Sequence, residues 1–345
     1  MIEYNNLLND ILLTKISSIT SFNLFLFIIF ALLLSLTVDI ILGELPTKIH
    51  PVVIIGSMIN FFKSKFIRFK NKLSGLFVIL GVCIVSSVIL YIIYLISSIN
   101  LLLFIIIFII LLSSTFSVKM LLQTAVDVKK AFDVSIDKAR QLVSYLVSRD
   151  TNELTESFIV SATIESLTEN ITDSYIAPVF YYFIFGLIIL YYPINDNLYY
   201  LLLIPMFYRI SNTMDAMLGY KTEELKNIGY VPAKIDDILN YIPARIAGLF
   251  VVVSAFLLNL DGKNAYKIMR RDARKCPSPN SGFTMATTAG ALNIQLIKKD
   301  TYILGDDNKV ITKDDISKAV NLSKLTILLF TITIILLFTL INVIL

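Results

Sequence analysis

The chain has 345 residues, of which 56% are hydrophobic and only 16% are charged, and its mean hydropathy is +0.77. Soluble domains carry roughly 25% charged residues, so this composition excludes an ordinary soluble protein and predicts a polytopic membrane protein. The net charge of +4 is small, and the sequence contains no basic strip of the kind that would indicate a nucleic-acid partner. Two cysteines are too few for a disulfide framework or a zinc site.

Apolar runs alternate with polar segments along the chain. A bilayer core of about 30 Å requires about 20 apolar residues in a helix. Runs of this kind cover residues 22–42, 75–97, 101–118, 242–260 and 325–345, and a weaker pair covers 175–192 and 198–208. The weaker pair is joined by the turn-like residues 193–197, which is typical of a tilted hairpin or a re-entrant pair. We predict one all-α membrane-embedded domain over residues 1–345, with about six or seven transmembrane or re-entrant helices.

The loops indicate the sidedness of these helices. Residues 43–74 contain many Lys and Arg residues but only one acid, Glu44, so the positive-inside rule places them in the cytoplasm. Alternation from there would put residues 261–324 on the other side, although they are strongly basic. Either the run at 242–260 is re-entrant, or the number of crossings before it differs from this count. We favour one face for the polar segments 149–178, 211–245 and 270–296.

The first polar segment, residues 39–59, contains the only histidine, His50. A lone histidine is more often structural than a ligand. Here Asp39 lies near the end of an apolar run, and Glu44 and His50 follow it. Ionisable residues at membrane depth are costly and mark functional sites, so a substrate contact at His50 and a structural role stay open side by side.

Three carboxylates recur every four residues in the second segment, at Glu165, Glu169 and Asp173. On a helix this spacing places them along one face. Like charges four residues apart repel one another, so the pattern favours a cation in the site, either a metal or an ammonium group. The alternative is a solvated helix face.

The third segment contains two polar groups. Asn212 and Asp215 share a helix face three residues apart, with Lys221 nearby, and a capping role for Asn212 is the alternative. Further along, two acids and an amide occur within about one helical turn, at Asp236, Asp237 and Asn240. This set suits Mg²⁺, which prefers one or two carboxylates together with substrate phosphates. The alternative is a helix N-terminus after Pro232, where acids favour the helix dipole.

The fourth segment contains a turn that cannot be helical, Pro277-Ser-Pro-Asn-Ser-Gly282, after a group of arginines. Free backbone N–H groups beside guanidinium groups predict a clamp for phosphate or carboxylate. Small residues follow at 286–291, and they would equally allow a helix that packs closely on its neighbour.

Taken together, these segments resemble the adenosylcobinamide-phosphate synthase family of cobalamin biosynthesis (the CobD/CbiB family). The resemblance is carried, in the order typical of the family, by residues 39–59, 148–151, 162–186, 208–221, 233–248 and 271–296. Two departures stand out. Cys276 occupies the position before the Pro-Ser-Pro-Asn turn where the family usually has histidine. The hydrophobic residues 187–192 replace the family's glycine-rich hairpin.

The resemblance implies that (R)-1-amino-2-propanol, or its O-phosphate, is joined as an amide to the free propionate carboxylate of adenosylcobyric acid. It further implies ATP and Mg²⁺ as cofactors, a corrinoid substrate and a multi-pass protein of the cell membrane. A homo-oligomer and a complex with later membrane enzymes of the pathway both stay open.

Roles can be assigned on this basis as hypotheses. We expect Asp236, Asp237 and Asn240 to hold Mg²⁺ and nucleotide phosphate, and Arg245, Arg271 and Arg274 to clamp phosphate or the corrin carboxylate. One of Glu165, Glu169 and Asp173 would receive the ammonium and act as base. The remaining expected site residues are Asp215 and Lys221 for catalysis, and His50, Asn170, Asn212, Ser278 and Asn280 for substrate or phosphate binding.

Two other functions fit parts of the sequence. A Mg²⁺-dependent transferase acting on a lipid diphosphate could use Asp236–Asn240 together with the acidic stripe on the second segment. A small-molecule transporter would predict internal repeats, and none is convincing in this chain.

Overall fold

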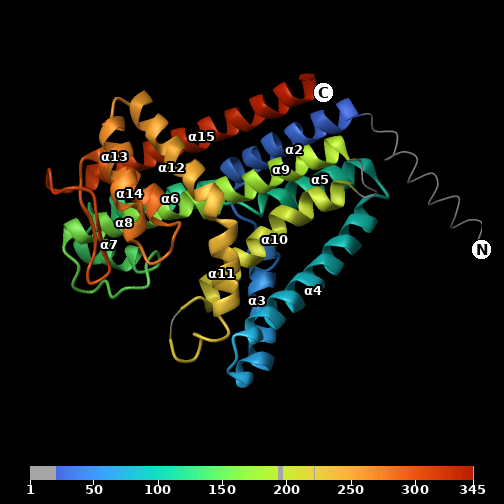
Figure 1. Cartoon of the computed structure of the whole chain (residues 1–345), viewed down its shortest axis with the longest axis horizontal. Coiled ribbons are helices and arrows are strands. Elements are labelled where there is room, and N and C mark those ends of the chain that lie inside the picture. The colour runs from blue at the N-terminus through green and yellow to red at the C-terminus, as the bar shows by residue number, and fades with distance from the viewer. Residues whose placement is uncertain (1–20, 193–196, 221, 345) are drawn as a thin grey trace, which may run out of the picture. The chain divides into compact units, whose positions relative to one another are not determined.

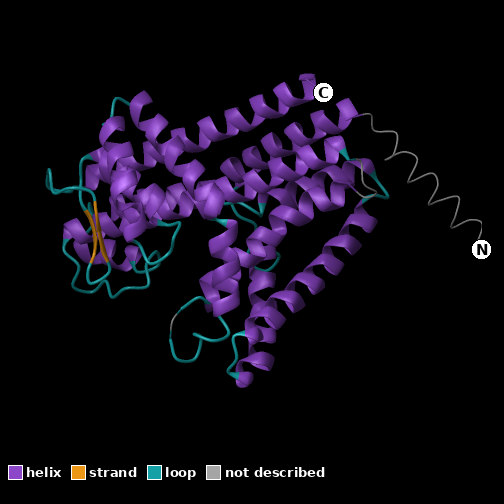
Figure 2. Ribbon diagram, in the orientation of Figure 1, coloured by secondary structure: helices purple, strands orange, loops and turns teal. Residues whose placement is uncertain are grey.

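Helices form nearly all of the chain in the computed structural model, which describes residues 21–192, 197–220 and 222–344. Figure 1 labels the helices along the chain, and Figure 2 shows two short strands in orange. These strands, β1 (Leu296–Lys298) and β2 (Tyr302–Leu304), pair antiparallel with Lys298 opposite Tyr302. The predicted all-α class is confirmed, and the hairpin is an addition that the sequence did not indicate.

Four helical runs in the described part of the chain are long and apolar enough to cross a membrane. They are α2 (Ser21–Leu42, with the span at Leu24–Leu42), α4 (Leu73–Ser97), the continuous run Glu156–Tyr191, and α15 (Lys313–Ile344). Two bent pairs raise the number to as many as six. One is α5 (Leu101–Ser113) with α6 (Val118–Ala131), bent by 40°, and the other is α11 (Tyr230–Leu239) with α12 (Tyr241–Leu257), bent by 47°.

Several helix ends differ from those expected. The run at 101–118 stops at Ser113, where Ser114 and Thr115 each donate a hydroxyl hydrogen bond to a carbonyl of the last turn at 2.7 Å. Such side chains compete with the helical backbone pattern. The run at 198–208 is part of the longer α10 (Asn197–Leu218). The turn expected at 193–197 lies almost entirely outside the described residues.

By internal packing the chain divides into two compact units. Unit 1 comprises residues 1–116, 178–233 and 334–345, and unit 2 comprises residues 117–177 and 234–333. In unit 1, α3 (Pro51–Phe66) packs on α4, and α10 packs on both of them. The ring of Phe338 lies 4.7 Å from that of Phe183 in α9 (Ala177–Tyr191), edge to face. Unit 1 is therefore a bundle of largely apolar helices.

Unit 2 is built around a short, fully buried helix, α14 (Gly282–Leu292), which packs against α12, α13 (Gly262–Asp272) and α8 (Glu156–Ile171). A Cβ on Gly290 would lie 2.7 Å from the carbonyl oxygen of Asn264 and 2.8 Å from the Cα of Ala265. The small residues at 286–291 thus allow close helix packing, which was the structural alternative for this run.

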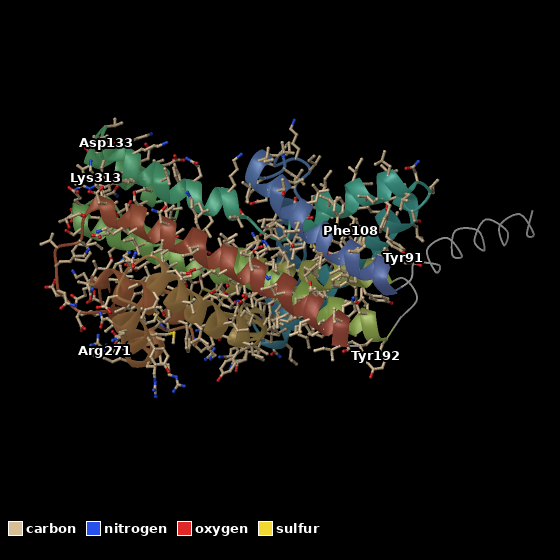
Figure 3. All side chains as sticks on the ribbon, turned by 90° about the horizontal axis from the view of Figure 1, so that it is seen from above. Tyr91, Phe108, Asp133, Tyr192, Arg271 and Lys313 are labelled. Carbon is tan, nitrogen blue, oxygen red and sulfur yellow. The ribbon has the colours of Figure 1, made fainter. Side chains whose placement is uncertain are left out.

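Ion pairs fasten the polar end of unit 2. Asp272 is fully buried and accepts hydrogen bonds from Arg271 and from the N–H of Gly305 at 2.9 Å, and its other oxygen is paired with Lys275 at 2.6 Å. Lys313, at the start of α15, is paired with Asp133 at 2.6 Å, and Figure 3 labels both residues. α7 (Ile136–Val143) and the 3₁₀ turn Ala273–Lys275 complete this unit.

Candidate functional site

The acidic stripe lies on α8, as predicted for Glu165 and Glu169, and then enters a π-helical turn, Thr172–Ile176, that contains Asp173. Glu165 is only 4% exposed, whereas Glu169 and Asp173 are half-buried. A π-helical turn within an α-helix frequently marks a functional site. Glu165 therefore does not lie on a solvated helix face.

Glu165 is surrounded by donors. Nη2 of Arg149 lies 3.2 Å from each of its carboxylate oxygens, Ser161 donates to Oε1 at 2.6 Å, and the hydroxyl of Tyr302 donates to Oε2 at 2.9 Å. A buried carboxylate with this many donors is held in a fixed position.

The same cluster attaches the β1–β2 hairpin to α8. The backbone N–H of Ile297 donates to the hydroxyl of Ser161 at 3.0 Å, and Nη1 of Arg149 donates to the carbonyl of Ile297 at 3.2 Å. Sequence reasoning assigned no role to Arg149, Ser161 or Tyr302. Arg149 begins the second polar segment, but no local pattern indicates Tyr302.

Cys276 and Tyr302 lie close to the carboxylates of α8. Burial raises the pKa of Cys276 to about 12; a hydrogen bond with Ser281 lowers it, and the charges of Glu169 and Glu165 raise it further. Burial, followed by the charge of Glu165, raises the pKa of Tyr302 as well. Both groups are therefore protonated at neutral pH, and Cys276 is a neutral thiol rather than a nucleophile.

The Pro277–Gly282 turn directly follows Cys276. Residues 277–281 are non-helical as predicted, whereas Gly282 is the first residue of α14, so the prediction is wrong for Gly282. Asn280 is 6% exposed; its amide donates to the carbonyl of Asp237 at 2.8 Å, and its Oδ1 accepts from Nη1 of Arg245 at 3.1 Å. Ser278 accepts from the N–H of Asn280 at 3.2 Å and lies 3.5 Å from Oδ1 of Asp237. The turn thus brings together four of the predicted site residues.

Arg245 is held at the start of α12. Its guanidinium stacks on the rings of Tyr241 and Phe283, the latter at 4.4 Å, and it donates to the carbonyl of Tyr241 and, at 3.4 Å, to that of Pro279. The charge of Arg274, which is exposed, acts on Arg245. This pair of cations beside a turn is suited to an anionic ligand.

Asp236 and Asp237 occupy the last turn of α11, which begins at Tyr230, so the proposed helix N-terminus after Pro232 is wrong. Asp236 is 8% exposed and accepts from the side-chain amide of Asn240 at 3.0 Å. Asp237 faces Ser278 instead, and it pairs with Lys234 at 3.4 Å. The three expected ligands therefore do not converge on one point: Asp236 and Asn240 contact each other, whereas Asp237 faces Ser278.

The donor set decides how a magnesium ion fits here. Within the described residues, no group of three or more His, Cys, Asp or Glu side chains could hold a metal. The side chain of Asp237 is 25% exposed and lies beside the turn that holds Arg245. One accessible carboxylate suits Mg²⁺, which keeps several waters and binds substrate phosphates.

The contacts of Arg271 are ion pairs and hydrogen bonds within unit 2. It pairs with Asp272 at 2.7 Å and Asp306 at 2.8 Å and donates to the carbonyl of Gly305 at 3.2 Å. Hydrogen bonds with both carboxylates raise its pKa. Arg271 therefore fastens the segment after β2 to α13, and its expected role as a phosphate clamp stays a prediction.

A separate polar group lies in unit 1. His50 is the N-cap of α3, and its Nδ1 accepts from the N–H of Val52 at 3.1 Å. Burial lowers the pKa of His50, the charge of Glu44 raises it, and that of Arg209 lowers it. Asn212 lies within α10 and accepts from Arg209 at 3.4 Å, so the capping alternative for Asn212 is wrong.

Of the other predicted residues, Asp215 lies in α10 and Asn170 lies in unit 2. Oδ1 of Asp215 approaches Gly219 so closely that an added Cβ would meet it at 2.2 Å. Lys221 lies outside the described residues. Asn170 is in α8, where its amide donates to the carbonyl of Ser166 at 2.8 Å.

Comparison with known proteins gives extensive matches. The family described as CobD/Cbib protein matches residues 32–323. The probable cobalamin biosynthesis protein CobD of Methanothermobacter thermautotrophicus is 42% identical over 304 residues, which cover 87% of this chain and 95% of that protein. The protein of the same description from Methanothrix thermoacetophila is 35% identical, covering 84% and 90%.

A bacterial relative extends the similarity. The cobalamin biosynthesis protein CobD of Clostridium perfringens is 33% identical over 304 residues, which cover 84% of this chain and 92% of that protein. No solved structure matches the chain.

Proposed function

The chain belongs to the CobD/Cbib family, and from this premise we propose that it acts in cobalamin biosynthesis as an adenosylcobinamide-phosphate synthase of the cell membrane. The proposed reaction joins (R)-1-amino-2-propanol, or its O-phosphate, to the free propionate carboxylate of adenosylcobyric acid. It consumes ATP and forms a carbon–nitrogen amide bond, so the protein would be a ligase.

This chemistry sets three requirements for the protein. A carboxylate is a poor acyl donor, and Mg²⁺ and ATP would, when bound, supply a phosphoryl group to activate it, with the phosphate charge partly neutralised. The protein must bind phosphate oxygens with cations. It must also hold the amine through an anionic group and accept a proton from the ammonium.

One observation carries the proposal: a guanidinium group and carboxylates lie close to the same turn, Pro277–Gly282. Arg245 contacts Asn280 of the turn. The charge of Glu169 contributes to the raised pKa of Cys276, which directly precedes the turn. A site with guanidinium and carboxylate groups around one turn suits an anionic phosphate and a cationic amine together.

The contacts suggest a role for each residue of this site. Asp237 would hold Mg²⁺ through its accessible carboxylate, and Arg245 with Arg274 would bind phosphate oxygens. Ser278 and Asn280 would line the same wall. The carboxylates of α8 would take the amine end of the second substrate.

Growth of a bacterial strain that lacks its own synthase tests the proposal. Supplied with cobyric acid, the strain should grow only when this chain is expressed. Asp237→Asn should abolish growth, whereas the matched control Asp307→Asn, at an exposed position, should not. All strains should grow on cobinamide, which bypasses the step. Absence of growth on cobyric acid, with the protein present in the membrane and cobinamide still effective, would refute the proposed function.

A further inference from the structure

A cavity of about 250 Å³ lies in unit 1, at the corner between the end of α3 and the start of α4. Its wall comes from two segments that are distant in the sequence, one within residues 67–74 and the other within residues 223–228. The two segments are in close contact, because a Cβ on Gly75 would lie only 2.2 Å from the carbonyl oxygen of Ile228. The cavity belongs to unit 1, whereas the Pro277–Gly282 turn belongs to unit 2.

The corner is strongly basic. Five cations occur within ten residues, at Lys63, Lys65, Arg68, Lys70 and Lys72. Two acids of the second segment also line the cavity, and each is paired with a lysine: Glu224 with Lys63 at 3.4 Å, and Glu223 with Lys226 at 3.8 Å. Both acids are therefore already neutralised, and positive charge is in excess around the cavity.

Lys70 is the lining residue that carries this excess charge. It is exposed, and within the described residues it makes no ion pair. It ends the 3₁₀ turn Ile67–Phe69 in the left-handed region, with φ 46°. Its ammonium group is therefore available to an anion in the cavity.

Ser74 adds a hydroxyl group to the same wall. The residue is 3% exposed, and its Oγ has no hydrogen-bond partner among the described residues. Buried polar side chains in native proteins nearly always have a partner. Ser74 is thus suited to donate a hydrogen bond to an oxygen of a ligand in the cavity.

The surroundings of the cavity indicate a lipid as the source of that oxygen. α4 begins at Leu73, directly after the basic corner, and only 22% of its apolar stretch is buried within the protein. Phe69 and Phe77, on either side of the first residues of α4, are 58% and 52% exposed. Lys and Arg clusters beside a membrane-spanning helix bind anionic headgroups, and exposed aromatic rings beside them can contact acyl chains.

We propose that this cavity binds the phosphate headgroup of an anionic phospholipid. Lys70 neutralises the phosphate, Ser74 donates a hydrogen bond to it, and Phe69 and Phe77 contact the acyl chains. The site is separate from the amide-forming reaction, and it fixes the corner between α3 and α4 at the membrane surface.

Native mass spectrometry of the purified, delipidated full-length protein in detergent tests this inference without any turnover. The protein is titrated with phosphatidylglycerol or with phosphatidylcholine of the same acyl chains, and the Kd of the first bound lipid is measured. The native protein should bind phosphatidylglycerol more tightly. Lys70→Asn should weaken that binding about fivefold, the effect expected of one lysine beside an anionic headgroup, and leave phosphatidylcholine binding unchanged.

Matched variants separate the site from general effects. Asparagine and glycine adopt a left-handed backbone more readily than lysine, so Lys70→Asn should fold, and Lys70→Gly serves as its second form. Lys48→Asn removes an equally exposed charge, before the other end of α3, and should bind like the native protein. Ser74→Ala removes a hydroxyl that no described group uses, so it should keep the native Tm and weaken phosphatidylglycerol binding about threefold.

Three results would overturn the inference. Equal affinity of the native protein for the two lipids would exclude recognition of the anionic headgroup. Equal losses in Lys70→Asn and Lys48→Asn would show a diffuse attraction of charges rather than a site. Displacement of phosphatidylglycerol by an equimolar amount of glycerol 3-phosphate would assign the cavity to a free phosphate compound instead of a lipid.

Discussion

The hydroxyl of Tyr302 donates a 2.9 Å hydrogen bond to Oε2 of Glu165, although 137 positions separate the two residues in the chain. The bond joins the hairpin to the helix that carries the acidic stripe. Its geometry shows why equal spacing in a sequence does not imply equal roles. Glu165 and Glu169 repeat four residues apart, but the first is enclosed by protein donors and the second is half-buried.

Arg245 should require its guanidinium shape and not merely its charge. Lysine cannot stack between Tyr241 and Phe283 while also donating to Asn280 and the carbonyl of Pro279. We expect Arg245→Lys to reduce kcat/KM about 10- to 100-fold, which corresponds to about 1.4–2.7 kcal/mol. The control Arg270→Lys alters an exposed arginine of α13. Equal activity of both variants would contradict the role assigned to Arg245.

Asp272 should stabilise unit 2 through its three partners. Replacing it with asparagine weakens charged hydrogen bonds from Arg271 and the Gly305 N–H and the ion pair with Lys275. We expect Asp272→Asn to lower the free energy of unfolding by about 1.5–3 kcal/mol, measured from thermal unfolding in detergent. Asp306→Asn, which removes only the more exposed partner of Arg271, should have a much smaller effect.

The pH dependence of the same variant supplies a second check. Burial alone would raise the pKa of Asp272, but hydrogen bonds from Arg271, Lys275 and Gly305 outweigh burial and bring its pKa down to about 2. Because the folded pKa is below the ordinary value of 3.8, the stabilisation is present above about pH 4 and is lost as the pH falls toward 2. The difference in Tm between native protein and Asp272→Asn should therefore shrink over that interval. A constant difference from pH 6 to pH 3 would be inconsistent with an ionised Asp272.

Gly290 should tolerate no side chain. A Cβ there would meet backbone atoms of Asn264 and Ala265 at 2.7 and 2.8 Å, and backbone cannot move aside as a flexible side chain can. Gly290→Ala should cost about 1–3 kcal/mol of stability, the range for overpacked cores. Gly56→Ala is the control, since its Cβ would contact only the flexible side chain of Met217, whose Sδ would lie 3.5 Å away. A similar Tm for the two variants would show that α13 and α14 can separate.

His50 should contribute to stability as a cap of α3. Its Nδ1 accepts the N–H of Val52, which requires that this nitrogen be unprotonated. His50→Ala should cost about 1 kcal/mol, whereas His50→Asn should keep most of the stability because asparagine caps well. Thermal unfolding of the three proteins at pH 7.5 makes the comparison. Burial lowers the pKa of His50, so the cap should persist below the ordinary histidine pKa and fail as the pH falls further.

Hydropathy alone was sufficient to predict the fold class, because a lipid environment requires long apolar helices whose backbone hydrogen bonds are made within the helix. Helix ends were less predictable. Ser114 and Thr115 end α5 through hydroxyl bonds to its last carbonyls, and an apolar run gives no warning of that. The run at 175–192 continues a helix that begins at Glu156, since the preceding residues are helical although less apolar.

Sequence patterns grouped candidate-site residues that are neighbours in the chain and did not reveal contacts between residues far apart in the chain. The Pro277–Gly282 turn and the α8 carboxylates follow from local patterns. Asp236 and Asp237 were expected at either a metal site or a helix start; the helix begins earlier, at Tyr230, and the two side chains point to different partners. The contact of Tyr302 with Glu165 depends on tertiary packing, so no spacing rule could reveal it.

The most direct measurement is mass-spectrometric detection of the amide product from purified protein in nanodiscs supplied with adenosylcobyric acid, (R)-1-amino-2-propanol O-phosphate, ATP and Mg²⁺. We expect adenosylcobinamide phosphate to form only when all four are present, and Asp237→Asn to form none. Failure of the folded native protein to form this product from either the amine or its phosphate would contradict the account.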